Sequence, residues 1–399
     1  MFRNRRGFTL IELVIVMAVF VTVLMISASA FNTIIVQATK VFRSEESNIE
    51  GVIGLEMLRH DLQQGGYGLF TEPTSYANEA ADTPASGFND APNNVPRPFV
   101  AGSISGTGVT IDSNTIVSGS DYLAIKGTTV GRTKTAQKWT FLKFSSSSVT
   151  PNKWASDAEN LSTSEQVVLI QKKFGTPPRS YLVRDPANSF YYAYSNSGFT
   201  NLSSSSKGIY AVYGVDNGGT LRFPFNRSDY FVARPSSTTT IPAYCAPNTG
   251  ILYKTTVNHA DGKLTYIPVL DCVLDMQVVL GWDINSDGVV DTWSNADGTA
   301  VTGLGAVSDV QSALGTTNNN SASSSPNIRN NLKIVKVYIL VQNGKKDSGY
   351  TSPSPLAVGD SGESSLTRPA GFSLTSDQMN YRWKLYRVVV RPKNLLSNQ

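Results

Sequence analysis

The feature that most constrains this chain is an apolar run of 19 residues near its N-terminus, Phe8 to Ile26. At 1.5 Å rise per residue, a helix of this length measures roughly 28 Å, about the thickness of a bilayer core. Glu12 is the only charged residue in the run. Three arginines precede it, and such residues hold the adjacent end of a membrane helix in the cytoplasm (Arg3, Arg5 and Arg6). The sequence therefore predicts a membrane-spanning helix with a short cytoplasmic end.

A small residue, Gly7, precedes the apolar run, whereas a secretory signal carries its small cleavage-site residues after the run. Cleavage after Gly7 would remove only a basic leader, residues 1–7, and would leave Phe8 at the N-terminus of a chain that keeps its membrane helix. A carboxylate within a membrane helix costs a few kcal/mol, so we expect Glu12 to have a partner. The amine freed on Phe8 would lie one helical turn from Glu12 and could supply a positive charge there.

The segment Gly7-Phe8-Thr9-Leu10-Ile11-Glu12 resembles the motif of type IV prepilins. The resemblance implies that a prepilin peptidase cleaves after Gly7, that the new amine on Phe8 is methylated, and that Glu12 pairs with the N-terminal amine of a neighbouring subunit during filament assembly. It also implies storage in the inner membrane, with the head in the periplasm, and later incorporation into a pilus at the cell surface. The alternative is a plain signal anchor with a stray polar residue.

The composition fits an exported protein. Of the 399 residues, 40% are hydrophobic, which is enough to bury a core in one large or two smaller domains. Only 16% are charged, and the abundance of Ser, Thr, Asn and Gly favours an all-β exported protein over a cytoplasmic enzyme. The net charge is +4, and the leader carries three positive charges, so the mature chain is nearly neutral. No basic patch indicates a nucleic-acid partner.

The N-terminal helix is predicted to run over residues 8–64, with residues 8–26 in the membrane. Its second half carries apolar side chains three and four residues apart, which places them on one helical face (Val52, Leu55, Leu58 and Leu62). Gly51 and Gly54 weaken this half by about 1 kcal/mol each relative to alanine, which allows local bending. The glycine-rich run at residues 65–68 is a plausible end of the helix.

The remainder of the chain is predicted to be a loop-rich connection, residues 65–120, followed by a β-rich head, residues 121–399. The clearest strand patterns lie in the second half of the head (Ile251–Val257, Lys263–Val269, Val273–Trp282, Leu332–Gln342 and Trp383–Arg391). The predicted fold class is therefore α+β and pilin-like. A long N-terminal helix, half transmembrane and half amphipathic, packs on a β-rich globular domain.

Five later segments resemble those of PilW-type minor pilins: LRHDLQQGGYG, DYLAI, LDCVLDMQVVLGWDINSDGVVDTW, LKIVKVYILVQ and YRVVVRPKN. This resemblance implies a minor pilin that supports pilus assembly, in the tip or in the complex that primes assembly. Its N-terminal helix would pack against other minor pilins and the major pilin. The central part, about residues 130–245, is expected only to follow the fold.

Two other functions stay open. A pseudopilin of the type II secretion tip complex shares the prepilin motif, and a tip adhesin would bind glycans through Ca²⁺. Catalysis by the chain is not expected. Its two histidines, His60 and His259, are interpreted as surface residues, and no serine or cysteine nucleophile motif flanks either one.

Cys245 and Cys272 are the two cysteines of the chain. In an oxidising periplasm a disulfide between them could contribute about 3 kcal/mol of stability through its effect on the unfolded state. Because the prepilin-like N-terminus puts this part of the chain outside the cytoplasm, we expect the disulfide to form. The alternative is two buried free thiols.

The segment from residue 283 to residue 291 has the pattern of a calcium loop. Oxygen-bearing side chains occupy positions one, three, five and nine, position six is glycine, and the carbonyl of position seven completes the set (Asp283, Asn285, Asp287, Asp291, Gly288 and Val289). Position twelve is Ser294 rather than the glutamate of an EF-hand, so Asp297 or a water would have to supply the missing oxygen. We expect a structural Ca²⁺ held on a β-hairpin or sheet edge. The alternative is an Asx-rich turn without a metal.

Overall fold

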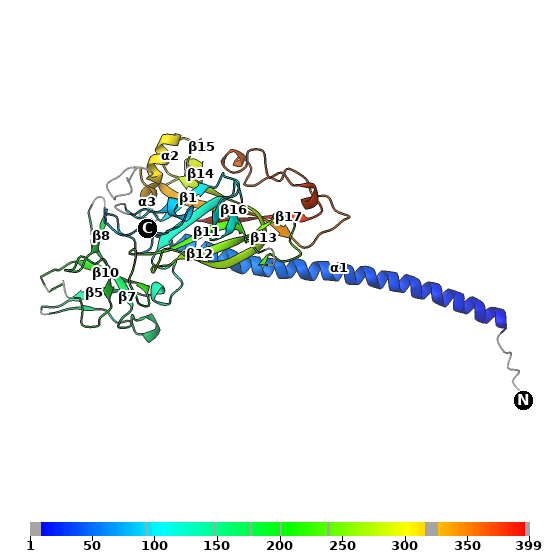
Figure 1. Cartoon of the computed structure of the whole chain (residues 1–399), viewed down its shortest axis with the longest axis horizontal. Coiled ribbons are helices and arrows are strands. Elements are labelled where there is room, and N and C mark those ends of the chain that lie inside the picture. The colour runs from blue at the N-terminus through cyan, green and yellow to red at the C-terminus, as the bar shows by residue number, and fades with distance from the viewer. Residues whose placement is uncertain are drawn as a thin grey trace, which may run out of the picture.

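The computed structural model describes residues 9–395, except residues 92–94, 147, 176–177, 200–201, 204, 238–239 and 316–325, and within the first helix it leaves out the side chains of residues 36, 37 and 39–50. The expected cleavage and methylation positions, Gly7 and Phe8, therefore lie outside the described residues. One long helix and a head built on two antiparallel sheets make up the fold, which confirms the predicted α+β class (Figure 1).

Helix α1 spans Leu10–Gln64, a length of 55 residues, and its N-terminal half projects away from the head (Figure 1). The glycine-rich run that follows turns the chain into the head. Gly66 and Gly68 have φ angles of +88° and +69°, a backbone conformation that glycine adopts without steric strain. The helix therefore ends at the run that the sequence indicated.

Eleven strands form the main sheet. Neighbouring strands run in the order β1-β4-β11-β12-β13-β16-β17, and every pair is antiparallel. β14 pairs with the second half of β13 and β15 pairs with β14, whereas β3 pairs with β11 and β2 pairs with β3. The strands are β1 (Phe99–Ser103), β2 (Thr110–Ile111), β3 (Asn114–Ile116), β4 (Asp121–Gly127), β11 (Asn226–Arg234), β12 (Gly250–Val257), β13 (Leu264–Trp282), β14 (Thr292–Asn295), β15 (Val301–Gly303), β16 (Leu332–Asn343) and β17 (Arg382–Val390).

Strand β13 organises the main sheet because it is 19 residues long and has three partners. Its first half pairs with β12, and its second half pairs with β14 and β16 on opposite edges. The side chains from Cys272 to Trp282 are all buried, which requires cover on both faces. A strand buried on both faces has a continuous apolar sequence, and this explains why the pattern here was clear.

Six shorter strands form a second sheet, in the order β6-β5-β10-β7-β8 with β9 beside β7. All six lie between β4 and β11 in the sequence, so this sheet is an insertion in the main one. It has a hydrophobic cluster of its own and lies at the end of the head away from α1 (Figure 1). The strands are β5 (Trp139–Phe144), β6 (Val149–Pro151), β7 (Gln166–Lys173), β8 (Arg179–Val183), β9 (Tyr192–Ala193) and β10 (Ile209–Asp216).

The segment of residues 65–120 contributes three strands, and β1 pairs with β4 along its full length. Short helices complete the head: α2 (Val307–Leu314), α3 (Ile328–Asn331) and the 3₁₀ turns η1 (Ala85–Phe88), η2 (Thr135–Gln137), η3 (Asp157–Glu159), η5 (Ser364–Leu366) and η6 (Ser376–Gln378). α1, α2 and α3 share one hydrophobic core with the main sheet, and residues around 69–88 pack on the sheet's other face.

A buried ion-pair network holds the stretch after α1 against the sheet. Lys126 Nζ of β4 lies 2.9 Å from Glu79 Oε2 and 2.6 Å from Asp90 Oδ2. Arg227 of β11 lies 3.0 Å from Glu79 Oε2 and 2.7 Å from Asp229 Oδ1. All five side chains are buried. Because a buried charge is tolerated only when it is paired, the network fixes this loop in one position.

Candidate functional site

Glu12 and Thr9 form the cap of α1. The Thr9 amide and hydroxyl both donate to Glu12 Oε2 at 2.9 Å, and the Glu12 amide donates to Thr9 Oγ1 at 3.4 Å. This reciprocal arrangement is a capping box, which satisfies amides that the first turn of a helix leaves free. Since Thr9 directly follows Phe8, the carboxylate lies close in the chain to the residue whose amine cleavage would expose.

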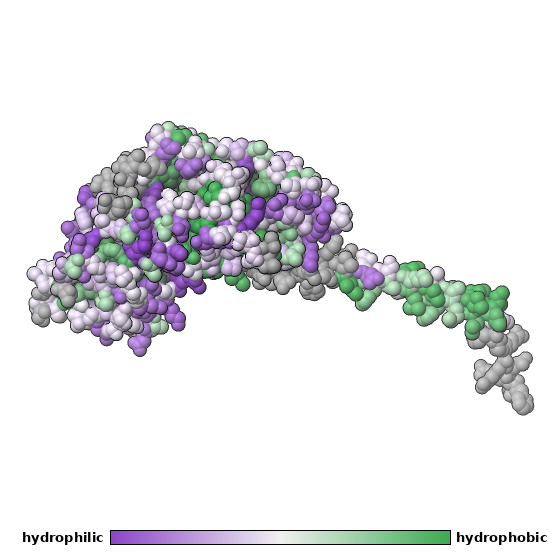
Figure 2. Space-filling model, viewed as in Figure 1, coloured by the Kyte–Doolittle hydropathy of each residue, from purple (hydrophilic) through white to green (hydrophobic). Residues whose placement is uncertain are grey.

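The segment Leu10–Ile35 of α1 is long and apolar enough to cross a membrane, judged by its length and composition. Its mean hydropathy is 2.7, and none of it is buried against the head. Figure 2 shows apolar side chains along this part of the helix. The Thr22 hydroxyl donates to the carbonyl oxygens of Ala18 and Val19, so its polar group is satisfied inside the helix. Glu12 is the only Asp, Glu, Lys or Arg in the segment.

The last turns of α1 attach the helix to the head. Leu58 and Leu62 are fully buried in the core shared with the main sheet, and Leu55 packs against it. Val52 was predicted to share this face, but its side chain is 61% exposed. The prediction for Val52 was wrong because the buried face continues through Gly51 and Gly54, which an apolar periodicity does not count.

These two glycines allow the helix backbone to lie close against the sheet. A Cβ atom at Gly51 would lie 2.9 Å from Tyr386 Oη of β17, and one at Gly54 would lie 2.7 Å from Val269 Cγ1 of β13. Both distances are too short for an ordinary contact. The glycines therefore serve close packing of α1 on the sheet, a role that the sequence interpretation of local bending missed.

Asp61 makes the polar attachment between α1 and the head. Its Oδ2 accepts a hydrogen bond from the Tyr230 hydroxyl at 2.7 Å and lies 2.6 Å from Lys254 Nζ. Tyr230 and Lys254 come from β11 and β12, so one carboxylate ties the helix to two strands. Asp61 also hydrogen-bonds the exposed His60, which raises the pKa of that histidine. Asp61 was not predicted from the sequence, although a carboxylate one residue before a core leucine was a possible signal.

The calcium-type loop connects β13 to β14, a β-hairpin as expected. Asp283 is buried at the start of the loop, and its two oxygens accept the amides of Asp287 and Gly288 at 3.0 and 2.9 Å. Asp291 Oδ2 accepts the amides of Ile284 and Asn285, both at 3.1 Å. The loop therefore wraps its backbone around side-chain oxygens.

The remaining loop positions are more open. Asn285 Oδ1 accepts the amide of Asp287 at 3.0 Å, and Val289 is exposed, with its amide donating to Asp287 Oδ1 at 2.8 Å. Gly288, at position six, has a φ of +92°, which is the sharp turn expected of glycine there. Hydrogen bonds from the loop's own amides to its side-chain oxygens thus support its present form.

Three observations bear on whether this loop holds a metal. Lys333 Nζ lies 3.3 Å from Asp283 Oδ2, and the lysine partly neutralises the negative charge that would attract a cation. The Ser294 hydroxyl accepts a hydrogen bond from Trp282 Nε1, and Asp297 Oδ1 accepts one from the Thr299 hydroxyl. Within the described residues, no group of three or more His, Cys, Asp or Glu side chains converges in a way that could hold a metal ion.

Cys245 and Cys272 form the expected disulfide, with Cα atoms 5.1 Å apart and a sequence separation of 27. Cys272 lies in β13, and Cys245 lies in the connection between β11 and β12. The bridge ties that connection to the central strand of the main sheet.

The two histidines differ in their surroundings. His60 is exposed on α1, as expected. His259, in the β12–β13 hairpin, was expected at the surface but packs its ring on Phe223, with ring centroids 4.3 Å apart. Burial lowers the pKa of His259 to about 4. His259 is thus half-buried rather than fully at the surface, because a tight turn sequence does not reveal what packs against it.

Two family models match the chain. The model described as "Prokaryotic N-terminal methylation motif" matches residues 2–28, and the model described as "Type IV Pilus-assembly protein W" matches residues 229–394. No curated protein and no solved structure matches. The first match contains Gly7, Phe8 and Glu12. The second runs from β11 through β17 and contains both cysteines and the β13–β14 loop, whereas the inserted sheet lies outside both matches.

Proposed function

The chain is a PilW-type pilin by its two family matches, and we propose that it acts as a minor pilin in the tip or assembly-priming complex of a type IV pilus. The family points to a structural subunit rather than an enzyme. The observation that carries the proposal is a membrane-length apolar helix that is wholly exposed, rigidly attached to a folded head and marked by one carboxylate near its N-terminus.

An exposed apolar helix of this length needs an apolar environment that shields it from water. A bilayer covers it first, and other helices of the same kind cover it in a filament. In our proposal a prepilin peptidase cleaves after Gly7 and Phe8 is methylated while the chain is held in the inner membrane with its head in the periplasm. The other minor pilins and the major pilin then contact the chain through Leu10–Ile35, and the subunit leaves the membrane without exposing the helix to water.

Glu12 gives this packing a register. A carboxylate in an apolar environment is stable only when a positive charge or several donors satisfy it. In the single chain its partners are the amide and hydroxyl of Thr9, at 2.9 Å each. A neighbour's N-terminal amine would add the charge that Thr9 does not provide. Because one ionisable residue occurs in the span, one axial position is favoured.

The head supports a place at the tip. It carries a second sheet inserted between β4 and β11, at the end away from α1 (Figure 1). Repeated packing along a shaft leaves little lateral room for such an insertion, whereas a subunit at the end of the filament has open space on one side.

Assembly is tested with Glu12→Gln and Glu12→Ala in a strain that lacks the native gene. We expect both variants to accumulate in the membrane at normal levels while the number of pili falls at least about tenfold. Glu56→Gln is the matched control, because Glu56 is an exposed carboxylate elsewhere on α1. Normal piliation with Glu12→Ala would contradict the assembly role.

Position is tested by immunogold labelling of the head on isolated pili. Label at filament ends supports the tip, and uniform label along shafts would overturn that part of the proposal. The type II secretion pseudopilin is the remaining alternative. A deletion strain that keeps its pili and loses secretion of folded exoproteins would favour it.

We also propose that the β13–β14 loop binds Ca²⁺ as a structural clamp. Its side chains offer the oxygen ligands that Ca²⁺ prefers, with glycine at the turning position. Binding would require the exposed Asn285 and Asp287 to turn inward and Lys333 to leave Asp283. Calorimetric titration of Ca²⁺ into the metal-free chain tests this, and absence of binding up to about 10 mM would overturn it, since extracellular modules bind at about 10⁻⁴ to 10⁻³ M.

A further inference from the structure

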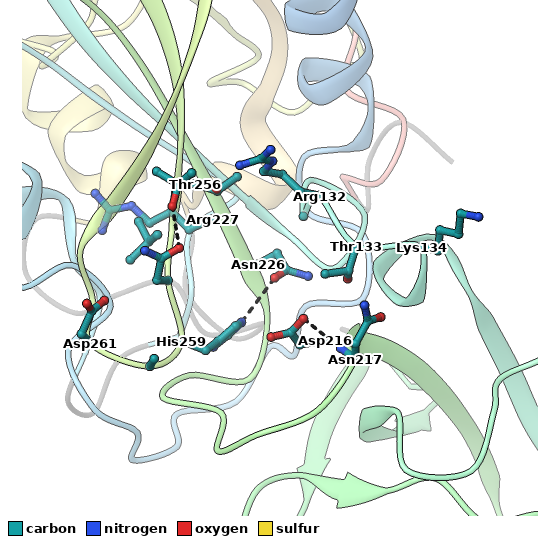
Figure 3. Close-up of a pocket in the computed structure, with 15 residues that line it drawn as sticks. Arg132, Thr133, Lys134, Asp216, Asn217, Asn226, Arg227, Thr256, His259 and Asp261 are labelled. Carbon is teal, nitrogen blue, oxygen red and sulfur yellow. Dashed lines mark hydrogen bonds between the residues drawn. The ribbon is translucent and has the colours of Figure 1, made fainter.

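A polar cleft of about 750 Å³ lies where the inserted sheet joins the main sheet. Four segments line it: the connection after β4, the end of β10 with the residue after it, the start of β11 and the β12–β13 hairpin (Figure 3). Its volume is within the range of about 300–1,000 Å³ that is typical of small-molecule sites. The lining residues include none from the assembly helix and none from the calcium-type loop.

Asn226 fixes the tautomer of His259 in this cleft. The Asn226 Nδ2 group donates to the carbonyl oxygens of Thr128 and Val215, at 2.8 and 3.1 Å. Its Oδ1 therefore faces His259 Nε2, 3.3 Å away, as an acceptor (Figure 3). It follows that Nε2 carries the proton and that Nδ1 presents a bare lone pair.

That lone pair is unused. Nδ1 of His259 is buried and has no hydrogen-bond partner. Burial also lowers the pKa of His259 to about 4, so the ring is neutral at physiological pH. A second proton therefore does not satisfy Nδ1. A buried acceptor without a donor costs free energy, so the position favours a hydroxyl or amide donor from outside the chain.

The rest of the lining offers acceptors and donors in balance. Asp216 and Asp261 each use one oxygen for a nearby amide, at 2.8 and 2.9 Å. Arg132 and Lys134 lie on the opposite segment and form no ion pair within the described part of the chain (Figure 3). Arg227 is already neutralised by Asp229 and Glu79. The lining thus includes two cations and two carboxylates besides the paired Arg227, so the cleft favours no net charge.

We propose that this cleft binds a neutral sugar unit, whose hydroxyl groups both donate and accept hydrogen bonds. A ring hydroxyl donates to His259 Nδ1, others donate to Asp216 and Asp261, and Arg132 donates to a ring oxygen. The site lies at the root of the inserted sheet and depends neither on Ca²⁺ nor on filament assembly, so it goes beyond the proposed pilin function.

The test uses the full chain with ¹⁵N-labelled histidine in phosphocholine nanodiscs, because maltoside detergents would themselves offer a sugar. His60→Gln leaves His259 as the only histidine signal. The free protein should show a protonated Nε2 and a bare Nδ1. A protonated Nδ1 in the free protein would overturn the proposal at this first step.

Galactose, glucose, mannose and N-acetylglucosamine are then titrated one at a time. We expect at least one to move the Nδ1 resonance saturably, with a dissociation constant on the order of 1 mM. Asp216→Asn should weaken that binding about tenfold or more, while the exposed Asp157→Asn leaves it unchanged. Glycerol controls for bulk effects.

Three results would overturn the proposal. One is no saturable shift with any of the four sugars. Another is equal behaviour of Asp216→Asn and Asp157→Asn. The third is tighter binding of N-acetylneuraminic acid than of any neutral sugar, lost in Arg132→Gln, since this would identify an anion site instead. None of these outcomes involves cleavage at Gly7 or the role of Glu12, so failure here is distinct from failure of the pilin function.

Discussion

Asp61, near the end of α1, and Lys254, in β12, form an ion pair of 2.6 Å that is closed off from solvent at the junction of helix and head. The Tyr230 hydroxyl completes the site by donating to the same carboxylate oxygen. This contact, the leucines that flank it and the close packing at Gly51 and Gly54 together join the helix to the main sheet. The junction therefore determines whether helix and head move as one body.

Asp61→Asn should destabilise the head by about 3 kcal/mol, because it leaves Lys254 buried without a counter-charge. Urea unfolding of the full chain, followed by tryptophan fluorescence, measures the loss. Adding Lys254→Met to Asp61→Asn should restore part of it, since the uncompensated charge is then gone. Glu56→Gln on the same helix is the control, and an equal effect there would count against a special role for Asp61.

Gly54→Ala tests close packing of the helix on the sheet. Alanine favours a helix by about 1 kcal/mol over glycine, so an open position would gain stability. Here the new methyl would lie 2.7 Å from Val269 Cγ1, and we expect a net loss of about 1–3 kcal/mol from overpacking. Val52→Ala, at an exposed position, should change stability by less than about 0.5 kcal/mol. A more stable Gly54→Ala protein would contradict the packing described here.

Stability should fall as pH rises from about 5 to about 7, through Asp121. Burial raises the pKa of this carboxyl from its usual 3.8 to about 8, with Asp275 and Asp297 adding to the shift and Arg368 opposing it. The folded state thus binds a proton that the unfolded state has lost. The contribution is complete below about pH 4 and disappears as pH rises through about 8.

Asp121→Asn should remove this dependence, because the amide is neutral at every pH and can still accept the Val278 amide, which now donates at 2.7 Å. Relative to Asp121→Asn, the unaltered chain should lose about 1 kcal/mol per pH unit over that window. Urea midpoints at half-unit pH steps give the comparison. Parallel curves for the two proteins would show that Asp121 is ionised throughout.

Lys333→Met tests the proposed Ca²⁺ clamp by removing a competing positive charge. The lysine lies 3.3 Å from Asp283 Oδ2, where it competes with a bound cation. Its removal should tighten Ca²⁺ binding several-fold, whereas Asp287→Ala should abolish binding. With a dissociation constant of about 10⁻⁴ to 10⁻³ M, 10 mM Ca²⁺ should stabilise the unaltered chain by about 1–3 kcal/mol. If Ca²⁺ changed the melting temperature of neither the unaltered chain nor Lys333→Met, the loop would be an ordinary turn without a metal.

The parts of the fold that were predictable from the sequence are those with a clear pattern of apolar residues. The 55-residue helix combines a long apolar run with a glycine stop, and Val278 to Leu280 is buried on both faces, as its continuous apolar sequence indicated. Residues 388–390 form an equally continuous apolar run, yet Val389 is 39% exposed, because three consecutive valines do not reveal which face of β17 is covered.

Other features depend on contacts that no local pattern contains. Lys126 and Arg227 lie in strands at positions that look solvent-facing, yet both are fully buried, since residues 79–90 fold back over them with matching carboxylates. The cleft at His259 is assembled from four segments that lie more than a hundred residues apart at their extremes. The order of strands in the inserted sheet could likewise not be predicted, because its apolar runs are short and bounded by polar residues.

Processing at the N-terminus is the claim on which the pilin function rests, and mass spectrometry of the intact chain from its native membrane tests it most directly. We predict a mature chain that begins at Phe8, with or without one added methyl group, from both the unaltered gene and Glu12→Ala. An uncleaved chain, or one cut after residue 26, would contradict the pilin function and leave an anchored or secreted β-rich protein.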